Sequence, residues 1–152
     1  MTFDAWMRHA KLDWVDYVKV DVEGFDPDVV RGALPVLRER KIGMISFEIG
    51  SNAKGRPWAT TTIKQMVDEL EQVGYYTYFI GDYRLYKMSH GCWDGVYDEP
   101  MMFRWANAVA IMRTHPLHDE VLKAFRSHGC KRSTNQQTTN KNTIYRCSRF
   151  SK

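Results

Sequence analysis

The sequence reads Tyr17-Val-Lys-Val-Asp-Val-Glu-Gly24 and continues directly into Phe25-Asp-Pro-Asp28. An apolar run that ends in two acids and a glycine, just before a helix start, is typical of a buried parallel strand that brings carboxylates to a ligand crevice. Ligands of open α/β sheets bind outside the carboxyl ends of the strands. Asp21 and Glu23 are therefore the first candidates for a functional site.

The alternation of side chains along this strand predicts how the two acids act. A strand over residues 15–22 places Asp21 and Glu23 on one face and the flanking valines on the other, so both acids can act on one ligand. The mostly apolar character of the strand indicates that it is covered on both faces. In the structural alternative, Asp21 accepts hydrogen bonds from nearby backbone N–H groups and Glu23 pairs with a lysine.

Periodic apolar residues and turn residues divide the rest of the chain into alternating elements. Asp26 is expected to cap the next helix, Pro27 to be its first residue, and Pro35 to kink or split it. A capping box at Thr62–Gln65 and a stop at Gly74 bound the clearest helix. The predicted helices cover residues 2–10, 26 onward, 62–73 and 118–128, with Val121, Leu122 and Phe125 facing inward in the last. The predicted strands cover 15–22, 44–49, 75–80, 83–88 and 107–112, with a two-residue turn at Gly81-Asp82.

Three of these segments together resemble a known family. The first strand, Val29-Val-Arg-Gly-Ala33 and Met44-Ile-Ser-Phe-Glu-Ile49 match in order the FkbM-type S-adenosylmethionine-dependent methyltransferases, most closely over residues 15–49. The resemblance extends over about residues 2–112. It implies a Rossmann-like α/β sheet whose last strand, 107–112, is antiparallel and inserted near the sheet edge after Trp105-Ala-Asn107.

The resemblance also implies what precedes this sequence in family members, namely the glycine-rich turn and acidic strand end that bind the cofactor. We therefore expect an α/β, Rossmann-like methyltransferase sheet that is N-terminally truncated. S-adenosylmethionine is the cofactor implied by the family, and no cofactor-binding residues are assigned in this chain. The expected consequences are weak cofactor binding by the chain alone and self-association through an exposed sheet edge.

The predicted catalytic residues are Asp21, Glu23 and Glu48, the last of which ends the neighbouring strand. Methyl transfer to a hydroxyl often needs a base that removes the proton of the acceptor, and carboxylates suit that role. Three carboxylates also suit a magnesium-type ion. No further ligand is identifiable, and hydrogen bonding to an acceptor hydroxyl explains the same residues, so no metal site is predicted.

The loop Ser89–Gly95 and the aromatic residues near it offer weaker candidates. His90 is an alternative base if this loop covers the crevice, and otherwise is an exposed loop histidine. Four aromatic residues either stack on a sugar or aromatic acceptor or pack in the core: Trp93, Tyr97, Phe103 and Trp105.

The distribution of charge marks a separate tail, and the cysteines bear on disulfide and zinc sites. Six basic and no acidic residues lie between 131 and 152, so the net charge of +4 leaves −2 for residues 1–130. We assign residues 1–130 to a partial FkbM-like domain and 131–152 to a basic polar tail, which is predicted to be disordered. Cys92, Cys130 and Cys147 form no C-x-x-C pair, so neither a disulfide framework nor a zinc site is predicted.

The sequence thus predicts a methyltransferase that O-methylates a small-molecule or carbohydrate hydroxyl. The alternative is a non-catalytic fragment or binding module derived from a methyltransferase. Nucleic-acid binding rests on the tail alone and comes third. No apolar run approaches the ~20 residues of a membrane span, and the sequence does not indicate the compartment.

Overall fold

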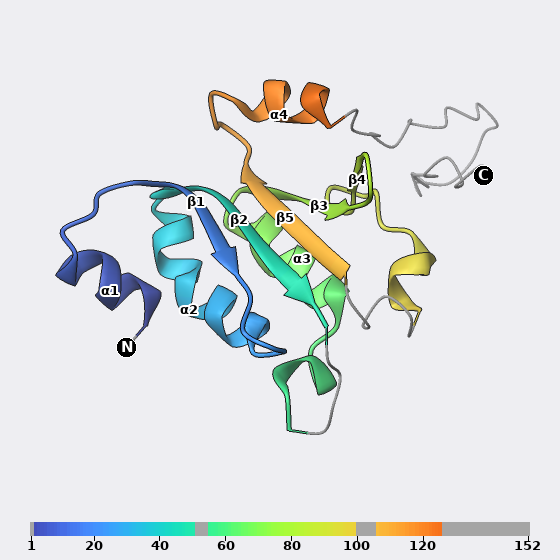
Figure 1. Ribbon diagram of the computed structural model, residues 1–152, viewed down its shortest axis with the longest axis horizontal. Coiled ribbons are helices and arrows are strands. Elements are labelled where there is room, and N and C mark those ends of the chain that lie inside the picture. The colour runs from blue at the N-terminus through green and yellow to red at the C-terminus, as the bar shows by residue number, and fades with distance from the viewer. Residues whose placement is uncertain (1, 51–54, 100–105, 126–152) are drawn as a thin grey trace, which may run out of the picture.

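The computed structural model describes residues 2–50, 55–99 and 106–125. Figure 1 shows a sheet with helices packed behind it and one short helix above it. The α-helices are α1 (Phe3–His9), α2 (Asp26–Arg38), α3 (Ile63–Gln72) and α4 (His118–Ala124), and the 3₁₀ helices are η1 (Pro57–Ala59) and η2 (Gly95–Asp98). The strands are β1 (Val15–Val20), β2 (Ile42–Ile49), β3 (Tyr75–Ile80), β4 (Leu85–Lys87) and β5 (Ala106–Met112).

The five strands form one mixed sheet in the order β1-β2-β5-β3-β4. β1 and β2 are parallel, whereas β5 lies antiparallel between β2 and β3. β3 therefore runs in the same direction as β2. The structure confirms the predicted α/β class and the inserted antiparallel strand.

One face of the sheet carries the main hydrophobic core. Side chains of α2 and α3, such as Leu37 and Met66, pack against β2 and β5 residues, such as Phe47 and Ala108. A smaller cluster on the other face joins β3 and β5 to Val121 and Leu122 of α4. The helices therefore cover the two faces unequally.

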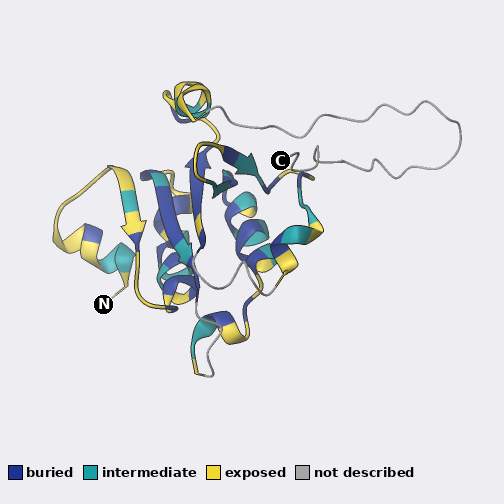
Figure 2. Ribbon diagram, turned by 45° about the vertical axis from the view of Figure 1, so that its right-hand side comes forward, coloured by how far each residue is buried: buried dark blue, intermediate teal, exposed yellow. Residues whose placement is uncertain are grey.

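β1 differs from its prediction in length and in burial. It ends at Val20, and its residues are mostly exposed or half-buried, with Tyr17 51% exposed. The outer strand in Figure 2 accordingly carries much of the exposed colour. The prediction of coverage on both faces was wrong because β1 lies at the edge of the sheet in the described structure.

The start of α2 also differs from its prediction. Phe25, not Asp26, is the N-cap residue, and its side chain makes no capping bond. Asp26 is instead a fully buried residue inside the first turn. Pro35 lies within a continuous helical segment from Asp26 to Arg38, so the helix is not split.

Elements with local sequence signals agree with their predictions. Thr62 and Gln65 form the capping box of α3, and Gly74 after it has a positive φ of 95°. Thr2 caps α1 by accepting a hydrogen bond from the N–H of Ala5. β3 has the predicted bounds.

Three local predictions were wrong. Ile80 pairs with Leu85, so four residues, not two, connect β3 to β4. Phe125 is exposed and does not face inward. Cys92 is disulfide-bonded, although the spacing of the cysteines predicted no disulfide framework.

Some predictions lie outside the described residues. These concern the tail at 131–152, the centre of the loop after β2, Phe103 and Trp105. Among the described residues, no helix has both the length and the apolar character needed to cross a bilayer.

Gly43 generates the first testable prediction. A Cβ built there would lie 2.7 Å from the ring of His115 and 2.8 Å from the backbone oxygen of Asp16. Gly43→Ala should therefore lower the free energy of unfolding by about 1–3 kcal/mol, as expected for overpacking. Chemical denaturation measures the change.

Gly95→Ala is the matched control, because a Cβ there would meet nothing within 4 Å. If both substitutions changed the free energy of unfolding equally, the close contacts at Gly43 would not be what limits the packing there.

Candidate functional site

Glu48 lies near the carboxyl end of β2, where it pairs across the ladder with Asn107 of β5. The side chain is half-buried. Burial raises the pKa of its carboxyl group above 4.5, and the nearby charges of Asp21, Asp26 and Glu23 raise it further. Four acidic groups therefore lie within electrostatic range of one another at this end of the sheet, including all three predicted site residues.

The turn after β1 places two of these acids. Because the strand ends at Val20, strand alternation does not position Asp21 and Glu23, and that part of the prediction was wrong. Glu23 has a φ of 53° and Gly24 a φ of 92°, so the chain turns sharply here. A positive φ is unfavourable for glutamate, and Lys11, Arg40 and His90 share this conformation in other turns of the chain.

Asp26 holds this turn against β2. Its carboxylate accepts hydrogen bonds from the N–H groups of Gly24, at 3.3 Å, and Glu48, at 3.0 Å. Sequence analysis missed this role because an Asp-Pro pair before a helix predicts an exposed N-cap. The sequence has no local signal that reveals the burial of Asp26.

Asp21 has a different environment, on the exposed side of the turn. Its carboxylate receives a hydrogen bond from Nζ of Lys19 at 2.9 Å, and this contact raises the pKa of Lys19. Lys19, to which sequence analysis gave no role, thus partly neutralises the acidic group. Surface ion pairs of this kind are weak, so a ligand can compete for Asp21.

The segment after β2 borders the same site. The indole of Trp58 donates to the backbone oxygen of Glu48 at 3.1 Å. The guanidinium of Arg56 lies 4.6 Å from the centre of the Phe25 ring. The described part of this loop therefore contacts the end of β2 and the turn before α2, which agrees with the prediction that the loop borders the site.

The arrangement of the acids suits hydrogen bonding. Within residues 2–50, 55–99 and 106–125, no group of three or more acidic, histidine or cysteine side chains is placed to hold a metal ion. Carboxylates accept hydrogen bonds from hydroxyl groups, and one with a raised pKa is better suited to accept a proton near neutral pH.

The weaker candidates lie elsewhere. The backbone N–H of His90 donates to Glu71, and its ring packs against Tyr76, which pairs with Ile111 at the opposite end of the sheet from Glu48. His90 therefore does not cover the carboxylates. Tyr97 is buried in the main core and Trp93 packs against it, so these two aromatic residues follow the packing alternative.

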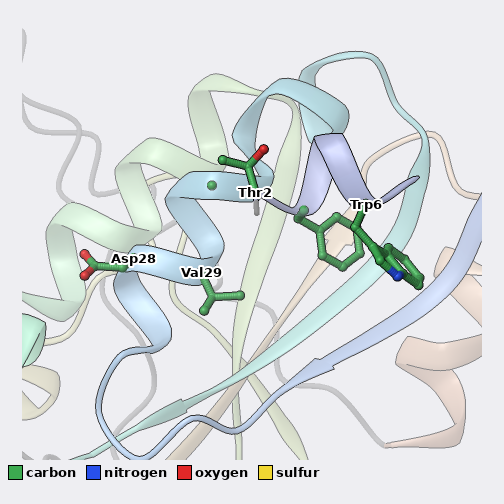
Figure 3. A pocket seen from close by; sticks show the side chains of 6 residues that line it. Thr2, Trp6, Asp28 and Val29 are labelled. Carbon is green, nitrogen blue, oxygen red and sulfur yellow. The ribbon is translucent and has the colours of Figure 1, made fainter. Parts of the chain in front are cut away.

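A separate groove lies between α1 and α2, with a volume of about 460 Å³. Figure 3 shows four of the residues that line it, Thr2 and Trp6 from the α1 segment and Asp28 and Val29 from α2. None of the three predicted site residues lines it. The groove is thus distinct from the carboxylate site.

Comparison with known proteins gives one match. A family model described as the methyltransferase FkbM domain matches residues 1–76, half of the 152-residue chain. The matched segment contains Asp21, Glu23 and Glu48. Searches of curated proteins and of solved structures both find no match.

The raised pKa of Glu48 generates a prediction about stability. The folded state disfavours the ionised form of Glu48. The protonated carboxyl group therefore makes its full contribution to stability below pH 4.5, and this contribution is lost as the pH rises through the raised pKa. Glu48→Gln should therefore increase the free energy of unfolding at about pH 7, and the gain should vanish at about pH 3. Urea denaturation at the two pH values measures both.

Glu120→Gln, at an exposed position in α4, is the control. A Glu48→Gln protein that is less stable than the wild type at neutral pH would contradict the electrostatic description of the site.

Proposed function

This chain belongs to the methyltransferase FkbM family, and we propose that it contributes the acceptor side of a methyltransferase site. The family uses S-adenosylmethionine as methyl donor. The proposed reaction is O-methylation of a hydroxyl on a small molecule or carbohydrate. The observation that carries this proposal is the group of carboxylates around Glu48, at the strand end where α/β proteins bind their ligands.

The environments of the carboxylates favour different roles. Glu48 is proposed to accept the proton of the acceptor hydroxyl, because its raised pKa brings it closer to the working range of a general base. Asp21 and Glu23 are proposed to hydrogen-bond the acceptor, since both are exposed beside Glu48. Asp26 has a positioning role, because its carboxylate binds the backbone.

The residues fit an acceptor better than they fit the cofactor. A Rossmann-type cofactor site needs a glycine-rich turn that lets the backbone approach the ligand closely. β1 is followed by a turn with the single glycine Gly24, and no two glycines in the sequence are separated by one residue. We therefore assign no step of the reaction to cofactor contacts within this chain.

A second function is proposed on the same carboxylates. The exposed carboxylates Asp21 and Glu23 also suit a non-catalytic fragment or binding module that recognises hydroxylated ligands. Binding of a hydroxylated ligand without methylation would favour this alternative.

We also propose that the chain associates with a further chain through β1. The outer edge of β1 is paired with no described strand, and open edges of this kind promote strand pairing between chains.

Titration with S-adenosylmethionine tests the proposed division of the site. Isothermal titration calorimetry of the chain should show no binding in the micromolar range, because no glycine-rich turn is available to hold the cofactor. Clear micromolar binding by a soluble, monodisperse sample would show that the cofactor site lies among residues assigned here to the acceptor.

Methyltransferase activity tests the catalytic roles. It is measured in a reconstructed enzyme that joins this chain to the cofactor-binding segment of a family member. Glu48→Gln should lower turnover on the order of 10²-fold, as for loss of a general base. Asp21→Asn should act mainly on KM. Methyl transfer to a panel of hydroxylated acceptors gives both values.

Asp119→Asn, an exposed first-turn carboxylate in α4, provides the control and should leave turnover unchanged. Full activity of Glu48→Gln and Asp21→Asn would give these residues a structural role and would leave the catalytic assignment without support.

A further inference from the structure

Two cations approach the ring of Tyr76, one from each side of its strand. β3 lies between β5 and β4 in the sheet. Lys87 ends β4 opposite Tyr78, which is two residues from Tyr76. Arg113 follows β5, two residues beyond the Ile111 that pairs with Tyr76. Strand alternation therefore places both cations on the same face of the sheet as the ring.

The distances show that both cations contact this ring. Nζ of Lys87 lies 3.8 Å from the ring centre of Tyr76, and the guanidinium carbon of Arg113 lies 4.7 Å from it. Each contact is favourable, because the face of an aromatic ring attracts a cation. The two positive charges are nevertheless held close together.

Lys87 lacks a hydrogen-bond acceptor in the described structure. The residue is half-buried, and its Nζ makes no hydrogen bond or ion pair with a residue that the structure describes. Burial lowers the pKa of Lys87, the charge of Glu71 opposes this shift, and the charge of Arg113 adds to it. A partly desolvated ammonium group is unfavourable without an acceptor. Its three donors are therefore open to a ligand.

Glu71 neutralises only part of the positive charge. Its carboxylate accepts a hydrogen bond from the backbone N–H of His90 at 2.9 Å and lies 3.5 Å from Nδ1 of that residue. Its distance to Nη2 of Arg113 is 3.7 Å, which is long for an ion pair. The same Nη2 donates to the backbone oxygen of Glu71 at 3.1 Å. Two cations and one acid thus leave a positive charge around Tyr76.

From this arrangement we propose that Tyr76, Lys87 and Arg113 bind the phosphoryl group of a ligand. Guanidinium and ammonium groups are both common phosphate-binding groups, and their hydrogen bonds to an anion are strong. The hydroxyl of Tyr76 makes no hydrogen bond to a described residue and supplies a further donor. A phosphate monoester carries nearly two negative charges at pH 7, which matches two cations better than the single charge of a carboxylate.

The phosphoryl site is separate from the carboxylate site. Tyr76 lies at the start of β3, at the opposite end of the sheet from Glu48. None of the three phosphate-binding residues takes part in the proposed methyl transfer. Phosphate binding and methyl transfer can therefore be tested independently.

An NMR titration of the isotope-labelled full chain with inorganic phosphate tests the site, at constant ionic strength with chloride as the balancing anion. Amide signals of β3 and β4 near Tyr76 and Lys87 should shift and saturate, with a dissociation constant on the order of 1 mM. Lys87→Gln should raise this constant at least ~10-fold, because it removes a charge-assisted contact. Tyr76→Phe keeps the ring and should raise it about 3-fold.

Lys64→Gln is the matched control. It removes the same charge from the chain, but Nζ of Lys64 is paired with Asp68 at 2.5 Å and lies on α3. The dissociation constant should not change. Glycerol phosphate serves as a second ligand. Tighter binding than that of inorganic phosphate would identify an organic phosphate as the natural source, and equal or weaker binding would identify free phosphate.

Three results would overturn the proposal. The first is the absence of saturable shifts near Tyr76 at phosphate concentrations up to about 50 mM. The second is an unchanged dissociation constant in Lys87→Gln or, if that variant does not fold, in Tyr76→Phe. The third is equal weakening by Lys64→Gln and Lys87→Gln, which would show that the net charge of the chain attracts phosphate without a specific site.

Discussion

The buried carboxylate of Asp26 is the interaction on which the candidate site depends. Burial of a charged group is unfavourable unless it is hydrogen-bonded. Asp26 meets this requirement by accepting hydrogen bonds from the backbone N–H groups of Gly24, in the turn after β1, and of Glu48 in β2. One side chain thus joins the end of a strand, the start of a helix and the neighbouring strand. Hydrogen bonds to a charged acceptor are stronger than neutral ones, so the shape of this corner is well determined.

The sequence predicted elements whose signals are local and missed features that depend on neighbours. The capping box of α3 and the aromatic, β-branched run of β3 are local patterns, and the structure confirms both. β1 is apolar in the same way, yet it lies at a sheet edge, because strand patterns report suitability for a sheet and not the position within it. The approach of Glu48 to Asp21 and Glu23 followed from parallel strand ends. The burial of Asp26 did not, because it requires the tertiary contact with β2.

The two ends of the sheet carry different charged groups. Acidic groups gather around Glu48 at the carboxyl end of β2. Around Tyr76, at the start of β3, Nζ of Lys87 lies 3.8 Å and the guanidinium of Arg113 4.7 Å from the ring centre. Burial lowers the pKa of Lys87, so this cation beside the Tyr76 ring is only partly solvated. The acids around Glu48 therefore favour cationic ligands over anionic ones at the carboxylate site.

The backbone of Glu48 is held on both sides, by Asp26 at its N–H and by Trp58 at its carbonyl oxygen. Its carboxylate makes no hydrogen bond to a residue that the structure describes. Adjustment of this carboxylate to an arriving hydroxyl then needs only rotamer changes, which take picoseconds to nanoseconds in accessible side chains. Slower movements of the main chain are not required. The carboxylate can therefore reorient around a ligand while the strand that carries it keeps its place in the sheet.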